Sequence, residues 1–504
     1  MTRSVRFLGV MSIALFLSAP AGAAEPTVVT ESIDVRVVNV EVVAVDAKGQ
    51  RLRGLPASDL RLLVDGKEVP IEFFTEVAEG RTVEPQAKAE GGPAAPLPPA
   101  EAVGRNFLVF VDDSFSIAAQ RDGVLAKMEA DLKRMRPEDQ MAVLAFDGTK
   151  IDVLSPWTKD TAALARVYEA ARRRKAQGDL KLAQHRSMER DVDSTDEAAD
   201  NQELTGKERA FLMSFLETRV SPEARSQLGR TVPAIAAALR AFPAPPGRKV
   251  MLMVSGGWSF KVAPQLLGEI LQAANHLGYS VYPVDVASPT PETNRFLDGV
   301  AGLTGGKLVN TTLKQAPFEQ VVEDSGSYYW LGFTPSWKGD DRGHSVKVEA
   351  KRPGVTLRAR RSFSDLSRRV ENALQAESVL LFGGSTEKGK LLVELGAAKP
   401  AEKKMVEVPV TLGVPVDSLV FYPNNDGGYT AEIPLAVVAA DEKGGKSELP
   451  TARLRVAVRQ VPTGHGYARF QTTVKLRAVP QKLIFTVQDV GKGGALWGEA
   501  AFKP

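Results

Sequence analysis

The chain has 504 residues, more than one hydrophobic core usually holds, so we expect two or three domains. Hydrophobic residues make up 43% and charged residues 25%, a composition that excludes disorder over the chain as a whole. The net charge of +3 is too close to balance to predict a nucleic-acid partner. Because there is no cysteine, a disulfide framework, a thiolate zinc site and a cysteine nucleophile are all excluded.

Residues 1–24 are typical of a secretory signal peptide. Two basic residues, Arg3 and Arg6, precede an apolar stretch that is too short to span a bilayer, and small residues then form a cleavage site. We expect cleavage near Ala23 or Ala24 and a secreted or periplasmic protein. No later stretch reaches membrane-spanning length without charges, so no integral membrane segment is expected after cleavage.

Residues 25–77 predict an all-β N-terminal unit. Alternating and β-branched runs fill this segment, and Asp65-Gly66 lies between two of them, which is typical of a β-hairpin turn. The segment 78–104 then loses periodicity and is rich in Ala, Pro and Gly, so we interpret it as a linker.

Residues 105–324 alternate short apolar strands with amphipathic helical segments. That alternation predicts an α/β, doubly wound, mostly parallel sheet with helices on both faces. The expected strands are 106–111, 141–146, 248–254 and 279–284. The expected helices are 117–135, 160–175, 231–241, 262–277 and 291–303.

A polar, helix-favouring segment, 176–228, interrupts this alternation, and we interpret it as a helical insert. The basic run 172–175 comes just before it. Such a run can form an anion-binding patch, but a solvated helix face is favoured, because acidic residues follow and no aromatic residues interleave. The insert neighbours the carboxyl edge of the expected sheet, which suggests the hypothesis that it gates or contacts a partner.

The chain turns to β structure after the α/β region. Residues 325–365 predict strands that flank the α/β region, and they are expected to join the N-terminal strands in one β domain. Residues 366–504 begin with a short helix at 366–377 and continue with regularly spaced β runs, which predict a C-terminal β-sandwich.

One motif carries candidate chemistry. The expected strand 106–111 is followed directly by Asp112-Asp113-Ser114-Phe115-Ser116. This Asp-x-Ser-x-Ser pattern places one carboxylate and two hydroxyls at the carboxyl end of a buried strand, where open α/β sheets bind their ligands. Such oxygen ligands suit a hard divalent cation. Asp113 stands at the variable position and is expected to be exposed, with no ligand role.

These residues resemble a von Willebrand factor type A (VWA) domain, an adhesion fold with a metal-ion-dependent adhesion site (MIDAS). The apolar strands 141–146 and 249–254 and the turn Leu303-Thr304-Gly305-Gly306 resemble further landmarks of the family. The whole chain is similar to the bacterial secreted VWFA-related proteins common in acidobacteria. Those have a β segment before the A domain, and a Tyr-Tyr-x-Leu-Gly-like strand and a sandwich after it. The resemblance is specific between 105 and 363 and implies a VWA, Rossmann-like fold.

The resemblance also implies a metal shell built from three loops. The first loop maps onto Asp112, Ser114 and Ser116, whose serine oxygens would bind Mg²⁺ or Mn²⁺ directly while the aspartate holds a bound water. The second loop supplies a threonine just before a helix, and it maps onto Thr231. A plain helix N-cap is an equal alternative for that residue.

The third loop departs from the family. Gly256, in Ser255-Gly256-Gly257, stands where the family places an aspartate. The missing carboxylate lowers the expected affinity for Mg²⁺. Either a carboxylate of the partner completes the shell, or the site is vestigial and Asp112 only accepts hydrogen bonds from loop amides. Trp258, directly after this loop, is an interface anchor or, more in keeping with the sequence, packs the loop against the insert.

Other motifs do not assemble into a site. Residues 384–390 have the glycine and lysine spacing of a phosphate-binding loop, but a strand-like run follows where a helix is needed. The four histidines, at positions 185, 276, 344 and 465, lack metal spacing. Nothing pairs a nucleophile with a base, so no enzyme activity is expected.

We therefore expect a secreted or periplasmic, adhesion-type module that binds a protein partner's carboxylate through a cation in its MIDAS. The alternative is a metal-independent structural or scaffolding protein of the cell envelope with a degenerate metal site. The partner is expected to be a protein rather than a nucleic acid.

Overall fold

The computed structural model describes residues 37–83, 102–179, 222–242, 244–258, 267–287, 291–312, 315–337, 339–382, 391–402, 404–424, 426–441, 446–462, 466–488 and 495–504. The expected signal peptide, most of the expected linker and insert, the segment 384–390, His185 and His465 lie outside these residues. Within the described ranges, no helix is both long and apolar enough to cross a membrane.

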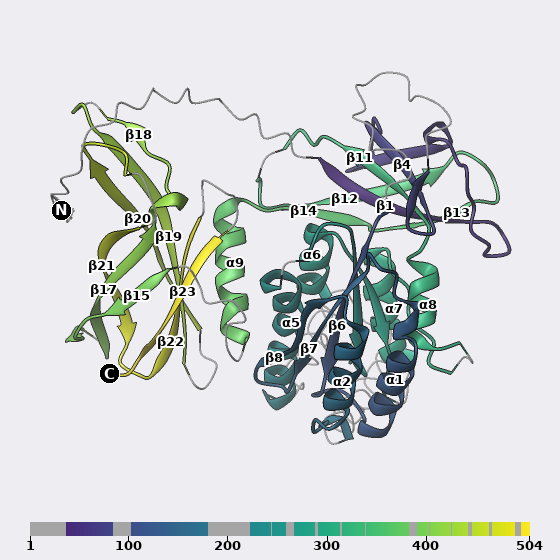
Figure 1. Ribbon diagram of the computed structural model, residues 1–504, viewed down its shortest axis with the longest axis horizontal. Helices are drawn as coiled ribbons and strands as arrows, with labels where there is room; N and C mark the ends of the chain where they lie inside the picture. Colours follow the sequence, from purple (N-terminus) through teal and green to yellow (C-terminus); the bar gives the residue numbers. More distant parts are fainter. Residues whose placement is uncertain are drawn as a thin grey trace, which may run out of the picture. The chain divides into compact units, whose positions relative to one another are not determined.

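A five-stranded sheet forms the centre of the α/β region, in the order β10-β9-β6-β7-β8 (Figure 1). Strands β6, β7, β9 and β10 are parallel, and β8 pairs antiparallel with β7 at one edge. All residues of β6, the middle strand, are buried, as expected for a continuous apolar run in a covered parallel sheet. The bounds are β6 Arg105–Asp112, β7 Gln140–Phe146, β8 Ile151–Thr158, β9 Arg248–Val254 and β10 Tyr279–Val284.

Helices cover both faces of this sheet. One face packs in a core with α1, α2 and α8, and the other packs with α5, α6 and α7. Successive residues of β6 alternate between the two cores, with Val109 in one and Phe110 in the other. The structure therefore shows the expected mixed α/β region, with a parallel-rich sheet that has helices on both faces. The bounds are α1 Ala118–Ala130, α2 Thr161–Arg172, α5 Pro222–Ala241, α6 Leu267–Leu277, α7 Pro291–Thr304 and α8 Pro317–Asp324.

Helix α5 begins earlier than the sequence predicts. It starts at Pro222, inside the segment 176–228 that we interpreted as an insert. Gly229 and Pro233 are typical of a helix boundary, which is why the sequence predicts a start at 231. In the structure the helix runs on through Pro233, and its buried residues join the core of the sheet.

Two antiparallel sheets combine the N-terminal strands with strands that follow the α/β region. Their orders are β13-β1-β11-β4-β5 and β14-β12-β2-β3, and one hydrophobic core contains residues of both. The N-terminal strands therefore pair directly with the strands that follow the α/β region. The expected turn joins β2 to β3, with Asp65 and Gly66 at φ 49° and 76°. The bounds are β1 Val38–Val45, β2 Leu60–Val64, β3 Lys67–Val69, β4 Phe73–Ala78, β5 Arg81–Val83, β11 Tyr328–Phe333, β12 Arg342–Ala350, β13 Thr356–Ala359 and β14 Ser362–Asp365.

The C-terminal strands form two antiparallel sheets that enclose a core of their own. Strand β17 pairs with β15, β16 and β21 in the first sheet; in the second, β19 pairs with β18, β20 and β22, and β22 pairs with β23. Helix α9 Arg368–Leu381 packs on the second sheet through Ala376 and Val379, against Val438 and Ile484. The strand bounds are β15 Leu392–Leu395, β16 Lys399–Pro400, β17 Met405–Pro415, β18 Tyr422–Pro423, β19 Tyr429–Asp441, β20 Lys446–Val458, β21 Tyr467–Arg477, β22 Gln481–Gln488 and β23 Ala495–Phe502.

Candidate functional site

Asp112 ends β6, and the loop that follows it carries the rest of the motif. Its Oδ1 atom accepts hydrogen bonds from the amides of Ser114 and Phe115, at 3.0 and 3.2 Å. The hydroxyl of Ser116 donates to the Asp112 carbonyl oxygen at 2.5 Å. The structure therefore brings Asp112, Ser114 and Ser116 together at the carboxyl edge of the sheet, where the sequence predicts them.

The third loop, after β9, contributes a hydroxyl instead of a carboxylate. Ser255 Oγ donates to Oδ2 of Asp112 at 2.7 Å and accepts the amide of Gly257 at 3.1 Å. The amide of Gly256 donates to the carbonyl oxygen of Phe115 at 2.7 Å. Ser255, rather than Gly256, is the residue of this loop that contacts Asp112, and it is not among the site residues predicted from the sequence. A signal for it was present, because β9 is the parallel neighbour of β6 and the residues after such strands meet at one edge.

The loop is closed to solvent. Asp112, Ser116 and Ser255 are 0% exposed, and Ser114 is 1% exposed. Burial raises the pKa of Asp112 to about 6, although hydrogen bonds from Ser255 and from the amides of Phe115 and Ser114 oppose that rise. The carboxylate is therefore held by neutral donors in a dry environment.

Asp113 is not exposed, contrary to the expectation from the sequence. It is 1% exposed, and its two oxygens accept from Arg121 Nη1 and Arg174 Nε, each at 2.6 Å. Two guanidinium groups compensate the cost of burying this carboxylate. Its role is structural, because it ties the loop after β6 to α1 and to the residues that follow α2.

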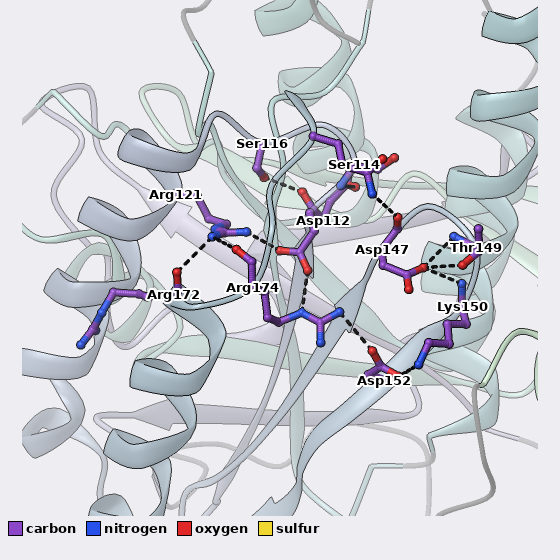
Figure 2. Close-up of polar contacts among 12 residues, drawn as sticks. Asp112, Ser114, Ser116, Arg121, Asp147, Thr149, Lys150, Asp152, Arg172 and Arg174 are labelled. Atoms are coloured by element: carbon purple, nitrogen blue, oxygen red, sulfur yellow. Dashed lines mark hydrogen bonds and ion pairs between the residues drawn. The ribbon is translucent and has the colours of Figure 1, made fainter. Parts of the chain in front are cut away.

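Residues 112–116 form the motif loop. The residues after α2, 173–178, lie against this loop, and we call them the strap. Arg121 from α1 and Arg174 from the strap both point toward the motif loop (Figure 2), where they bind the carboxylate of Asp113. The amide of Gln177 donates to the carbonyl oxygen of Asp113 at 2.8 Å, and the amide of Gly178 donates to that of Ser116 at 3.0 Å. The strap therefore binds the carbonyl groups of Asp113 and Ser116.

Most side chains of the basic run 172–175 form ion pairs within the protein. Arg172 pairs with Glu129 at 2.5 Å, and Arg173 pairs with Glu169 one helical turn earlier. Arg174 pairs with Asp113. These contacts leave little of the run for an anion-binding patch. Only Arg172 belongs to α2, and Arg174 is 21% exposed, so the run is not the solvated helix face that the sequence favours either.

Thr231 does not precede a helix. It lies well inside α5, which begins at Pro222, and it is fully buried. The N-cap interpretation of Thr231 is therefore wrong, and so is its expected place in a loop ahead of a helix. The late start predicted for α5 accounts for both errors.

Trp258 is a core residue. It is 0% exposed, and its ring centroid lies 4.3 Å from that of Phe296 in α7 and 5.9 Å from that of Phe115. The interpretation of Trp258 as an interface anchor is therefore wrong. Trp258 is instead a packing residue, as the sequence favours. Its contacts are with Phe296 of α7 and with Phe115 of the motif loop.

The oxygen ligands of the motif are of the kind that a hard cation prefers, but their closed arrangement does not suit one. Both carboxylate oxygens of Asp112 and the hydroxyl of Ser116 are engaged in hydrogen bonds within the protein. Mg²⁺ keeps several waters and usually needs one or two carboxylates, and this dry loop offers one. Among the described residues, no group of three or more His, Asp or Glu side chains is placed to hold a metal. The residues as arranged therefore do not fit a hydrated divalent cation.

The two described histidines lie away from this loop and are bound to carboxylates. His344 Nδ1 lies 2.8 Å from Asp65 Oδ2, and His276 Nε2 lies 2.8 Å from Glu371 Oε1. Their contacts support a structural role for both.

No protein-family model matches the sequence, and no curated protein matches it. Among solved structures, the chain is similar to three at low TM-score. The N-terminal domain of TFIIH p34 has a TM-score of 0.23 and 12% identity, and the match covers 44% of this chain and 95% of that one.

The VWA domain of SpRpn10 has a TM-score of 0.20 and 8% identity, over 40% of this chain and 82% of that one. The pilus adhesin SpaC from Lactobacillus rhamnosus GG has a TM-score of 0.23 and 8% identity, over 80% of this chain and 44% of that one. The chain is thus distantly similar to VWA domains and to an adhesin.

Proposed function

We propose that this chain is an exported, non-catalytic protein-binding or scaffolding module of the cell envelope, whose α/β region works without a bound cation. The observation that carries the proposal is the state of Asp112. Its carboxylate is fully buried and bound by two amides and the Ser255 hydroxyl. A cation at Asp112 would have to displace these hydrogen bonds.

The ionisable groups buried in the described α/β region support a non-catalytic role. Asp113 is bound by Arg121 and Arg174, and Asp139 by Arg105. These pairs hold elements together, and in the hydrogen bonds that the structure gives, Asp113 and Asp139 accept from arginine side chains and backbone amides rather than from a hydroxyl. Paired buried charges of this kind are structural more often than reactive.

Metal-dependent adhesion is the second candidate, favoured by one observation. Asp112, Ser114 and Ser116 do gather at the carboxyl edge of the parallel sheet, where such folds bind ligands. The two candidates differ in whether partner binding needs a divalent cation at Asp112.

Capture of partners from an envelope extract separates them. The baits are the wild type and Asp112→Asn, each with millimolar Mg²⁺ and with EDTA. Asparagine keeps an oxygen that accepts the amides of Ser114 and Phe115, but it removes the charge that a cation requires. We expect the same proteins in all four samples.

Thermal unfolding of the bait protein tests, in the absence of any partner, whether the bait binds a divalent cation. A ligand at 100 times its Kd stabilises the folded state by about 2.7 kcal/mol, so a bound cation would raise the Tm of the wild type. We expect no rise with Mg²⁺ or Mn²⁺. Capture that needs Mg²⁺ and disappears in Asp112→Asn, together with such a rise, would instead establish the metal-dependent mode.

A further inference from the structure

Strand β21 forms a long free edge of the first C-terminal sheet. It pairs with β17 over all of Tyr467–Arg477 without a register shift, and no described strand pairs with its other side. The longer edge strand β20 pairs with β19 through a register shift between Leu435 and Val437. Such bulges protect an edge from further pairing. Among the described strands, β21 is therefore the longest edge with an unbroken register.

The odd-numbered residues of β21 direct their backbone groups away from β17. The amide of Val416 donates to the carbonyl oxygen of Gly466, and the amide of Ala478 donates to that of Lys404, each at 2.9 Å. These two bonds bracket the strand, and hydrogen-bonded pairs alternate along an antiparallel ladder, so the even-numbered residues of β21 bond to β17. The side chains of the odd-numbered residues are also exposed, at Tyr467, Arg469, Gln471, Thr473 and Lys475.

The charge on this edge is basic. Strand β21 contains three basic residues and no acidic one, so an added strand meets only positive charge along it. Arg477 pairs with Asp441 at 2.7 Å, whereas Arg469 and Lys475 are exposed and form no ion pair with a described residue. Glu407 of β17 stands opposite Lys475 in the register, and the two are not paired either.

This charge selects among the strands that could add to the edge. A second copy of the chain, paired antiparallel about the middle of β21, would bring Arg469 opposite Lys475. Like charges directly opposite each other destabilise a sheet, and edge lysines and arginines commonly prevent self-pairing in this way. An extended segment with acidic side chains would instead complement both residues.

We propose that the free edge of β21 is a docking site for an extended, acidic segment of a partner protein, which adds to the sheet as a further strand. Backbone hydrogen bonds to the odd-numbered residues provide the affinity, and Arg469 and Lys475 select acidic side chains. The inference rests on the proposed function, because it names the segment by which this protein-binding module takes its partner. It requires no cation and no contact with Asp112.

A peptide of alternating Glu and Val, about eight residues long, is the probe, since that length spans most of β21. Its Glu side chains share one face of the extended peptide and can lie beside Arg469 and Lys475. Fluorescence anisotropy of the labelled peptide at low ionic strength measures binding. We expect saturable binding, at least about tenfold tighter than that of a peptide of alternating Lys and Val.

Thr473→Pro tests the backbone contact. Proline removes an amide that points to the free edge and places its ring against an incoming strand, but it breaks no hydrogen bond to β17. Thr473→Val is the matched control, because it changes the side chain and keeps the amide. We expect at least about tenfold weaker binding of the Glu peptide to Thr473→Pro than to Thr473→Val.

Arg469→Gln/Lys475→Gln tests the charge and leaves the backbone unchanged, so it keeps the test valid if the proline variant does not fold. We expect this variant to lose most of its preference for the Glu peptide over the Lys peptide. The control is Arg453→Gln/Lys482→Gln, which removes two basic residues of the second sheet, with side chains 82% and 36% exposed. It should bind both peptides as the wild type does.

Three results would overturn the docking site: no saturable binding of the Glu peptide to the folded wild type, equal affinities of Thr473→Pro and Thr473→Val, or self-association in sedimentation that Thr473→Pro abolishes. The last result would identify a second copy as the occupant. Each leaves the proposed function intact as long as the wild-type bait captures envelope proteins in EDTA. A wild-type bait that captures no protein under any condition would overturn the proposed function itself.

Discussion

Burial disfavours the charged form of the Asp112 carboxyl group, so its titration changes the stability of the folded chain by a measurable amount. Burial raises the pKa of its carboxyl group from 3.8 to about 6 in the folded chain. Between these two pH values the folded state holds a proton that the unfolded state has lost, so stability falls as the pH rises. The shift corresponds to about 3 kcal/mol, and above about pH 6 the loss is complete.

We therefore predict that Asp112→Asn flattens the pH dependence of stability in this window. Relative to the wild type, the free energy of unfolding of the variant should improve by about 3 kcal/mol as the pH rises from 3.8 to above 6. Urea unfolding across this range measures the difference. Asp426→Asn, at an exposed position, provides the control for the substitution itself. A slope that is the same in Asp112→Asn and the wild type would contradict the prediction.

His344 also predicts a fall in stability as the pH rises, but in a different pH window. Partial burial lowers the pKa of its imidazole, but hydrogen bonds to Asp65 and Asp340 outweigh this and hold the pKa above its usual 6.5. Its ring also stacks on Trp337, with centroids 3.8 Å apart. Because the folded pKa is raised, the stabilisation is complete below pH 6.5 and disappears as the pH rises through the folded value.

The substitution His344→Gln should remove that dependence. Glutamine keeps a polar side chain but carries no charge for Asp65 and Asp340, so the variant should be less stable than the wild type at pH 6 and approach it at high pH. Chemical unfolding at several pH values between these limits checks this. A constant difference between variant and wild type would show that the charge on His344 has no part in the stability.

Strand β6 is fixed at its start by an ion pair. Arg105 and Asp139 are 1% and 0% exposed, and Asp139 accepts from the amide, Nε and Nη2 of Arg105 at 3.0, 3.1 and 2.5 Å. Asp139 also accepts from the amide of Arg136, at 2.9 Å. One carboxylate therefore joins the first residue of β6 to the turn before β7.

Removing that carboxylate leaves a buried guanidinium without compensation. We predict that Asp139→Asn lowers the free energy of unfolding by about 3–5 kcal/mol. The control is Glu169→Gln, which breaks the exposed pair with Arg173 and should cost less than about 1 kcal/mol. Urea unfolding of both variants measures the contrast, and similar losses in the two would mean that burial does not set the strength of these pairs.

The elements that the sequence predicts best are those whose burial is uniform. Strands β6, β7, β9 and β10 are continuous apolar runs, and their positions follow from that pattern alone. Strand β8 is a half-buried edge strand with an interior proline, and β23 contains glycine and several alanines, so neither has a strong β signal.

Within the candidate site, contiguous residues were predictable, whereas residues held by distant partners were not. Asp112, Ser114 and Ser116 are contiguous and were predictable as a group. Local sequence gave no indication that Asp113 is buried, because its partners Arg121 and Arg174 are 8 and 61 residues away. The fit of Gly178 against Ser116 depends on how the chain returns after α2, which no local pattern encodes.

At the scale of the whole molecule, the β sheets that flank the α/β region in sequence depend on long-range pairing. Strand β1 lies between β11 and β13, with registers such as Val42 opposite Tyr329 and Val42 opposite Ala359. Strand β2 lies between β12 and β3. Val40 and Val42 are 0% exposed in the core that these sheets share. Strands β1, β2 and β4 are therefore interior strands of these sheets, although the chain between them and their later partners is long.

This predicts that cutting the chain does not release its N-terminal strands. With a protease site introduced between β5 and Ala102, the fragment that carries β1 to β5 should co-elute with the remainder on size exclusion in native buffer, because central strands are held on both sides. The two fragments should separate only in denaturant. Val42→Asp places a charge in the shared core and should release the fragment after cutting. Native elution of the wild-type fragment by itself would show that the pairing of β1 with β11 and β13 is too weak to hold it.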